Sequence, residues 1–369
     1  MNPHHVTPAG KTRARALKLP LPGEPGENNA ITDVAGVEVG VTTLIAGEGK
    51  LIVGKGPVRT GVTALLPRGR AKSQIPCAAG FYSLNGNGEM TGTIWIEESG
   101  ELQTPITITN THSCGVARDA TIEWLVRYGG GNVQDWGLPV AAETFDGDLN
   151  DINGFHVKAE HVIQALEGAR SGPVEQGSVG GGTGMICYDF KGGNGTASRM
   201  VKVAGRRHMV GAFVQSNFGQ RSECAILGVP VGLHLKGDEL RGKPQGSIIV
   251  IIATDAPLEA HQLKRLARRV PLGLARTGGI GHNSSGDIFL AFSTANEEAL
   301  SAKRGELRRM ETIGNGDIDP LLVATIEATE EAIIDSMIAN QTMVGRDGNR
   351  SVALPHDRLI DVMKKYGRM

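Results

Sequence analysis

The step Gly246-Ser247 places a hydroxyl nucleophile directly before the most apolar run of the chain, Ile248 to Ala253. A residue without a Cβ, a nucleophile and a buried strand, in this order, are typical of enzymes that cut their own backbone. A Gly-Ser pair is not informative by itself, because about two are expected by chance at this composition. Two occur, the other being Gly177-Ser178. The surroundings of Ser247 must therefore support the hypothesis.

Cleavage before Ser247 would create a new N-terminus that carries both a nucleophile and a base. The pKa of an α-amino group lies near 7.7–8.0, so roughly a tenth is free base at pH 7, whereas a lysine near 10.4 offers fewer than about one in a thousand. The freed amine of Ser247 is therefore suited to accept the hydroxyl proton near neutral pH. Before cleavage this nitrogen belongs to a peptide bond, so we expect the uncut chain to be inactive.

Other catalytic motifs are missing from the sequence. It contains no GxGxxG, HExxH or GxSxG, which leaves dinucleotide binding, a zinc protease site and an α/β-hydrolase nucleophile elbow without support. Gly10-Lys11-Thr12 resembles the end of a phosphate loop, but His5 stands where that motif requires glycine. His156 and His161 are five residues apart and off a common helical face, so we do not interpret them as metal ligands.

Composition excludes further classes of function. The chain has 369 residues and a net charge of −1, without the basic excess of a nucleic-acid-binding protein. No apolar run approaches the length of a signal peptide or a membrane span. Four cysteines without CxxC spacing indicate small buried residues in a reducing compartment: Cys77, Cys114, Cys187 and Cys224. We expect a soluble, cytoplasmic protein that binds neither nucleic acid nor a membrane.

Residues 1–29 are rich in proline, glycine and charge, which predicts an N-terminal arm. Its basic residues are interpreted as part of a solvated, partly disordered segment: Lys11, Arg13, Arg15 and Lys18. Residues 30–369 are expected to form a single domain. Glycine is about twice as frequent as usual, with 52 residues, which indicates many tight turns.

Hydrophobic spacing predicts several elements in that domain. In the first part we expect a strand over 105–109, helices over 116–128 (ended by Gly129) and 156–169, a tight loop over 180–184 and a strand over 185–190. After Ser247 we expect a strand to Thr254, then a helix capped by Asp255 with Pro257 in its first turn and apolar positions up to Leu274. A strand over 287–292 and a helix over 320–340 follow. Strands and helices without strict βαβ alternation indicate an α+β fold with sheets covered by helices.

The motifs around Ser247 resemble the self-processing L-aminopeptidase/D-esterase-amidase and β-peptidyl aminopeptidase enzymes, which have an N-terminal-nucleophile-like arrangement. The similarity extends from about residue 30 to 345. Its motifs are Gly246–Val250, Ala253–Leu258, Ser285–Ile288 and Ala291–Thr294, together with Asn110–Ser113, Glu143–Gly147 and Asn217–Gly219. The resemblance implies a four-layer αββα sandwich that cuts itself between Gly246 and Ser247 into two intertwined chains.

The resemblance also implies roles for individual residues. Ser247 is similar to the processed nucleophile, and Ser285 and Asp287 to the pair that orients its amine and hydroxyl. Asn217 is similar to an oxyanion-hole amide, and Glu143 to the carboxylate that receives the substrate's free ammonium. Phe145 stands where related enzymes can carry a tyrosine, so that part of the oxyanion hole must come from Asn217, a backbone N–H or water.

These implied roles lead to one functional hypothesis and two alternatives. The chain is expected to release N-terminal residues from short peptides, amides or esters through an acyl-enzyme on Ser247, without metal or organic cofactor. The implied assembly is a homo-oligomer of processed heterodimers. The alternatives are a self-processing acyltransferase of related architecture and an unprocessed binding protein without catalytic activity.

Overall fold

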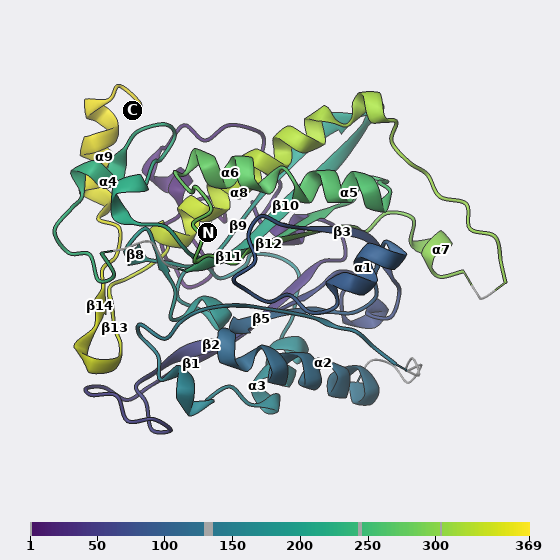
Figure 1. The fold of residues 1–369 in the computed structure, drawn as a ribbon. Coiled ribbons are helices and arrows are strands. Elements are labelled where there is room, and N and C mark those ends of the chain that lie inside the picture. The colour runs from purple at the N-terminus through teal and green to yellow at the C-terminus, as the bar shows by residue number, and fades with distance from the viewer. Residues whose placement is uncertain (1, 129–135, 243–245, 303–304) are drawn as a thin grey trace.

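Two β-sheets stack face to face between two layers of helices (Figure 1). The computed structural model describes residues 2–128, 136–242, 246–302 and 305–369. Within these ranges the smaller sheet has the order β1-β2-β5-β6 and the larger one the order β4-β3-β12-β11-β10-β9. The predicted αββα sandwich is therefore confirmed.

Most neighbouring strands are antiparallel, but each sheet contains one parallel pair. These pairs are β5–β6 in the smaller sheet and β11–β12 in the larger one. The smaller sheet consists of β1 (Glu38–Ala46), β2 (Val58–Leu66), β5 (Ile106–Asn110) and β6 (Val140–Thr144). The larger sheet consists of β3 (Cys77–Ser83), β4 (Glu101–Leu102), β9 (Gly193–Val203), β10 (Arg206–Asn217), β11 (Ser247–Thr254) and β12 (Asp287–Ser293).

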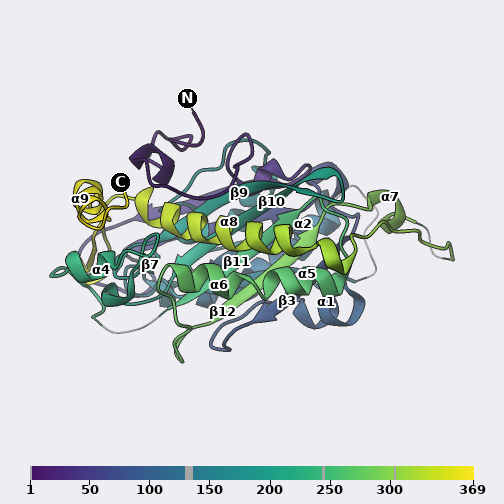
Figure 2. The same ribbon diagram turned by 90° about the horizontal axis from the view of Figure 1, so that it is seen from above.

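The helices cover the outer face of each sheet. On the larger sheet lie α5 (Ala260–Ala267), α6 (Val270–Arg276) and the long α8 (Asp319–Ile338), which crosses the strands in the view from above (Figure 2). On the smaller sheet lie α2 (Cys114–Tyr128) and α3 (Ala159–Glu167). The remaining elements are peripheral: α1 (Thr93–Ser99), α4 (Val231–His234), α7 (Glu297–Leu300), α9 (His356–Lys365), β7 (Ile186–Cys187), β8 (Phe190–Lys191), β13 (Met343–Val344) and β14 (Arg350–Ser351).

The apolar run after Ser247 is explained by burial on both faces of β11. Ile249 and Ile251 pack between the two sheets, whereas Ile248, Val250 and Ile252 pack toward the helices on the outer face. A strand covered on both sides has no polar face, so its sequence is apolar without alternation. This strand holds Ser247 at its first residue.

α8 approaches β9 closely because a glycine faces it. A Cβ added to Gly195 would lie 1.9 Å from the carbonyl oxygen of Ala332 on α8. The helix backbone therefore rests on a position that no side chain could occupy.

Three predicted elements differ from the structure. The expected strand over 185–190 is a hairpin of β7 and β8, because Tyr188 and Asp189 have positive φ angles of 51° and 58°. The expected helix over 156–169 begins only at Ala159. The helix expected after Asp255 is divided into α5 and α6, and its N-cap position is held by Glu259.

The capping role predicted for Asp255 is therefore wrong. Its carboxylate accepts a hydrogen bond from the backbone N–H of Met209 at 2.8 Å, so it joins the end of β11 to β10. The expected helix stop at Gly129 lies outside the described residues.

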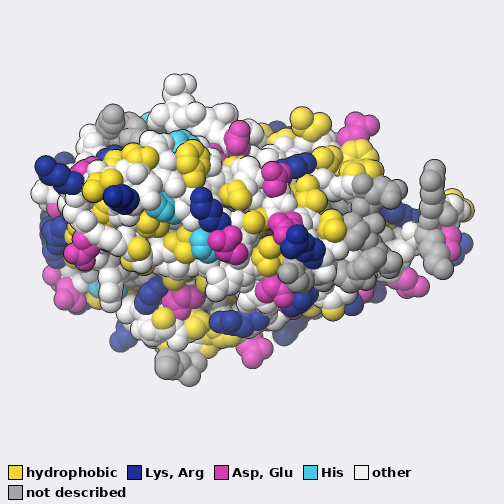
Figure 3. Space-filling view, turned by 90° about the horizontal axis from the view of Figure 1, so that it is seen from below, with side chains coloured by type: hydrophobic (Ala, Val, Ile, Leu, Met, Phe, Trp, Pro, Cys, Tyr) yellow, Lys and Arg dark blue, Asp and Glu magenta, His cyan; other side chains and the backbone are white. Residues whose placement is uncertain are grey.

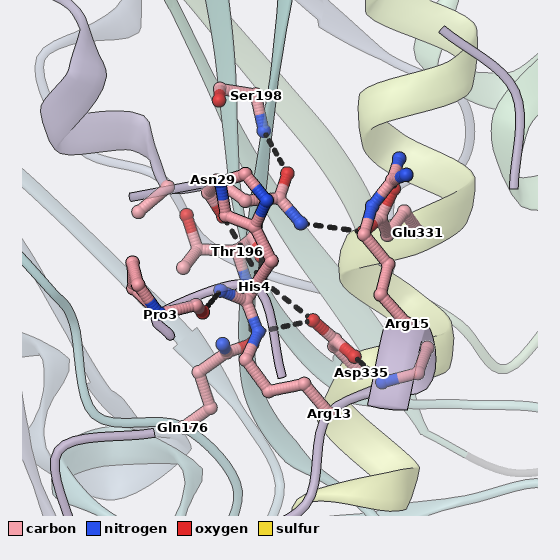
Figure 4. Close-up of polar contacts among 12 residues, drawn as sticks. Pro3, His4, Arg13, Arg15, Asn29, Gln176, Thr196, Ser198, Glu331 and Asp335 are labelled. Carbon is pink, nitrogen blue, oxygen red and sulfur yellow. Dashed lines mark hydrogen bonds and ion pairs between the residues drawn. The ribbon is translucent and has the colours of Figure 1, made fainter. Parts of the chain in front are cut away.

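The N-terminal arm is not solvated as predicted, because two of its arginines are paired with acids on α8 (Figure 4). Arg13 is 2% exposed, and its Nε donates to Asp335 at 2.8 Å. Arg15 donates to both carboxylate oxygens of Glu331 at 2.8 Å. Lys11 pairs with Glu175 at 3.0 Å, and of the four basic residues Lys18 is the one that is exposed.

The surface over α2 and α3 mixes charges of both signs with apolar side chains (Figure 3). This face thus differs from the one-sign basic patch of nucleic-acid-binding proteins. Among the helices that the structure describes, none has the length and apolar character needed to cross a bilayer. All four cysteines lie in described segments and are buried as free thiols, as predicted.

Candidate active site

Ser247 lies where the two sheets bring polar strand ends together. It opens β11 and is paired with Asn217, the last residue of β10. Ser247 is 4% exposed, and its Oγ accepts a hydrogen bond from the backbone N–H of Gly286 at 3.1 Å. The hydroxyl of Ser247 is therefore held by the segment that precedes β12.

Gly246 occupies a backbone position that requires glycine. Its φ is +114°, and an added Cβ would lie 1.6 Å from the carbonyl oxygen of Asn217. Both the left-handed backbone and the contact exclude any larger residue. The residue that carries the carbonyl group before Ser247 thus has no side chain of its own.

Asp287 and Ser285 form a hydrogen-bonded pair beside the start of β11. The Oγ of Ser285 donates to Asp287 Oδ1 at 2.5 Å, and the amide of Asn85 donates to Oδ2 at 3.0 Å. The backbone of Ile248, next to Ser247, also hydrogen-bonds to this carboxylate. Burial raises the pKa of Asp287, and these donors oppose that shift.

Asn217 is fully buried, with its amide held on both sides. Its Oδ1 accepts from the backbone N–H of Ile186 at 2.9 Å and from Arg241 Nη2 at 2.9 Å. Its Nδ2 donates to the carbonyl oxygen of Phe145 at 2.7 Å. A second Nδ2 hydrogen remains that makes no hydrogen bond within the described part of the chain.

Glu143 lies at the carboxyl end of β6, in the sheet opposite Ser247. One carboxylate oxygen accepts from the backbone N–H of Glu89 at 2.9 Å, and the other from the hydroxyl of Thr111. Glu143 is 2% exposed, and burial raises the pKa of its carboxyl, with the Glu89 carboxylate adding to the rise. A positively charged partner would therefore stabilise the ionised form of this buried carboxyl.

Glu143 and Ser247 line one cleft of about 690 Å³. A cleft of this size accommodates a small organic molecule or a short peptide. Its other lining residues are Gly86, Asn87, Gly88, Glu89, Thr111, Phe145, Gly246 and Ser284. The cleft is thus lined by both a carboxylate and a serine hydroxyl.

The structure brings the predicted site residues together in two layers. Ser247, Gly246, Glu143 and Phe145 line the cleft, whereas Asn217, Ser285 and Asp287 are buried behind it. Phe145 lines the cleft and accepts a hydrogen bond from Asn217 through its carbonyl, but it has no hydroxyl to donate.

Asn85, Gly286 and Arg241 belong to the site but were not predicted from the sequence. Asn85 and Gly286 lie in glycine-rich turns, which resemble ordinary loops in the sequence. Only the pairing of β3 with β12 places Asn85 beside Asp287. Arg241 had one local signal, its position five residues before the Gly246–Ser247 step.

Comparison with known proteins agrees with this geometry. The profile of Peptidase family S58 matches residues 29–351. The chain is 52% identical over 374 residues to the beta-peptidyl aminopeptidase BapA of Sphingosinicella microcystinivorans, covering 97% of this chain and 93% of that protein. BapA of Sphingosinicella xenopeptidilytica is 43% identical over 370 residues, covering 95% and 91%.

A solved structure extends the similarity to three dimensions. The L-aminopeptidase D-Ala-esterase/amidase of Ochrobactrum anthropi superposes with a TM-score of 0.91 at 46% identity, covering 96% of this chain and 99% of that one. That enzyme is described as a prototype for the serine aminopeptidases and a variant of the Ntn hydrolase fold. On the strength of the profile match, the two aligned aminopeptidases and this shared fold, the chain belongs to peptidase family S58 and is an aminopeptidase with an Ntn-hydrolase-like fold.

Proposed function

We propose that the chain cuts itself between Gly246 and Ser247 and then removes N-terminal residues through an acyl-enzyme on Ser247. The observation that carries this proposal is the cleft in which Ser247 and Glu143 face one space. A nucleophile and an ammonium-binding carboxylate on the same cleft are what an aminopeptidase requires.

The first step is attack of Ser247 Oγ on the carbonyl carbon of Gly246. The C–N bond breaks as the C–O bond of an ester forms, and the hydroxyl proton passes to the leaving nitrogen. Water then hydrolyses the ester, which gives a carboxylate on Gly246 and an α-amino group on Ser247. The absence of a Cβ on Gly246 and the fixed position of Ser247 Oγ favour this attack.

In the second stage the α-amino group of Ser247 acts as the base for its own hydroxyl. Asp287 lies beside this end of β11, and its negative charge stabilises the ammonium formed when the amine accepts the proton. Ser285 and Asn85 keep the carboxylate in place through hydrogen bonds of 2.5 and 3.0 Å. The proton is returned to the leaving amine of the substrate.

Glu143 provides the selectivity for a free N-terminus. A substrate ammonium in the cleft pairs with this buried carboxylate, whereas an internal peptide bond has no charge to place there. Asn217 supplies one amide N–H to the oxyanion, a contact typically worth about 3–4 kcal/mol of barrier. Phe145 cannot supply a second one, so we assign that donor to a backbone N–H or water.

The relatives suggest the substrate class. Two of them are named beta-peptidyl aminopeptidases and the third an L-aminopeptidase D-Ala-esterase/amidase. We therefore propose short peptides, amides and esters with a free amine, including those that begin with a β-amino acid. A homo-oligomer of cut chains, in the cytoplasm, is part of the same proposal.

The test is the state of the purified chain. We expect fragments 1–246 and 247–369 on a denaturing gel, with Ser247 found by N-terminal sequencing of the second. Ser247→Ala should give one intact band and no activity, because the nucleophile is lost. Ser178→Ala is the matched control, since it changes the other Gly-Ser pair and should leave cutting intact. Cutting by Ser247→Ala at the same bond would refute the assignment.

Product analysis separates hydrolysis from acyl transfer. With an added amine acceptor, a hydrolase continues to release the free acid as its main product, whereas an acyltransferase forms the amide. An active chain that stays continuous across residues 246–247 would refute the whole mechanism.

A further inference from the structure

We propose that Arg241 is a positioning residue that sets Asn217 as a hydrogen-bond donor to the reacting carbonyl. This inference rests on the proposed function, since it concerns the oxyanion of the same reaction. Arg241 is nearly inaccessible, with 2% of its side chain exposed. A guanidinium is expensive to bury, so its contacts must compensate for lost water.

The guanidinium bridges a carboxylate and the Asn217 amide. Its Nε donates to Asp148 Oδ2 at 2.6 Å, and its Nη2 donates to Asn217 Oδ1 at 2.9 Å. Its Nη1 donates to the carbonyl oxygen of Ile186 at 3.2 Å. Because Asp148 holds the Nε–H of this planar group, Nη2 is presented to Asn217 in a defined orientation.

These contacts determine the orientation of the Asn217 amide, that is, where its oxygen and its NH₂ group point. Arg241 and the N–H of Ile186 can only donate, so the atom between them must be the amide oxygen. The NH₂ group is therefore directed to the side of Phe145, whose carbonyl accepts one hydrogen at 2.7 Å. Phe145 and Gly246 both lie against Asn217 and both line the cleft, so we assign the remaining N–H to the oxyanion.

Arg241 also places a positive charge beside the scissile residue. Its Nη1 lies 3.1 Å from the point that a Cβ on Gly246 would occupy. A charge on the acceptor side of Asn217 polarises the amide and strengthens its N–H as a donor. Arg241 thus acts without contacting the substrate.

The first experiment measures how fast freshly made chain is cut. Arg241→Met should slow cutting about ten- to a hundredfold, less than loss of the oxyanion donor itself. Arg241→Lys keeps the charge but not the bidentate geometry, so its rate should be intermediate. In the cut enzyme both variants should lower kcat with little change in KM. Circular dichroism confirms that each variant is folded.

Arg13→Met is the matched control. It removes another buried guanidinium that is paired with an aspartate, Asp335, but on the far side of the larger sheet. It should lower the unfolding midpoint and leave the cutting rate of folded chain unchanged.

The second experiment tests whether Arg241 acts through Asn217. In an Asn217→Ala background, Arg241→Met should have little further effect on the cutting rate, since there is no amide left to position. Two outcomes would overturn this inference alone. In one, the rate reductions caused by the two changes multiply in the double variant. In the other, folded Arg241→Met is cut at the wild-type rate. An uncut wild-type chain would overturn the proposed function together with it.

Discussion

At the scale of single residues, the site contains two carboxyl groups whose charged forms are destabilised by burial. Glu143 and Asp287 both have a raised carboxyl pKa because of burial. A cationic partner lowers that cost, and the proposed reaction would supply one to each: the substrate ammonium to Glu143 and the protonated amine of Ser247 to Asp287.

Glu143→Gln tests this at the substrate end. The change keeps the shape but removes the charge, so it should raise KM for free-amine substrates at least tenfold with a smaller effect on kcat. The N–H of Glu89 can still donate to the glutamine oxygen, and the hydroxyl of Thr111 can accept from the glutamine NH₂ group. Steady-state kinetics measure the effect, and an unchanged KM would exclude the recognition role.

The pH dependence of amine binding provides a second readout for Glu143. Because its pKa is raised, the carboxyl takes up a proton at a higher pH than an exposed glutamate does. The inhibition constant of a simple primary amine should therefore increase as pH falls through that pKa, and Glu143→Gln should remove this limb. An inhibitor without an acyl group avoids interference from the titration of the Ser247 amine.

At the residue scale, the sequence directs attention to residues that stand in local motifs. Ser247, Ser285 and Asp287 stand in short segments that resemble the family, and the structure places them close together, while their catalytic roles stay predictions. Asn85 and Arg241 were missed because their roles depend on contacts with residues 202 and 24 positions away. No periodicity or spacing encodes such contacts.

At the scale of elements, apolar periodicity predicted those that are long and buried. β11 and α8 were predicted to within two residues at each end. The segment 185–190 was predicted as one strand because most of its residues are apolar. Two of its residues, Tyr188 and Asp189, have positive φ and form the turn between β7 and β8. Asp255 was wrongly predicted as a helix N-cap, because the sequence does not show which backbone N–H the tertiary fold brings near its carboxylate.

The close packing of α8 on β9 gives a prediction at this scale. Gly195→Ala should destabilise the protein by about 1–3 kcal/mol or more, because the new Cβ meets the Ala332 carbonyl and the helix must move. Gly115→Ala, on α2 with no atom within 4 Å of the new Cβ, should instead stabilise by up to about 1 kcal/mol. Thermal or urea unfolding measures both, and equal effects would contradict this view of the packing.

At the scale of the whole molecule, the arm is part of the folded body. Its proline, glycine and charge predicted a solvated tail, but Arg13 and Asp335 are 322 positions apart and meet only in the fold. A backbone N–H of the arm, that of Ala14, also donates to Asp335 at 2.6 Å. The sequence offers no means to pair charges over that separation.

Arg13→Met should cost about 3–5 kcal/mol of stability, since it leaves the carboxylate of Asp335 buried without its cation. The double variant Arg13→Met/Asp335→Asn should lose less, because no unpaired charge remains. Urea unfolding of the three variants, single and double, measures the coupling. A double variant as unstable as the sum of the two single changes would show that the pair does not interact.

The position of β11 and β12 has a consequence for the protein after the proposed cut. Both strands belong to fragment 247–369, yet they lie between β10 and β3 of fragment 1–246. The two polypeptides therefore share one sheet and cannot come apart unless that sheet unfolds. Specific activity should stay constant on dilution, and mixing with inactive enzyme should yield no hybrid by fragment exchange.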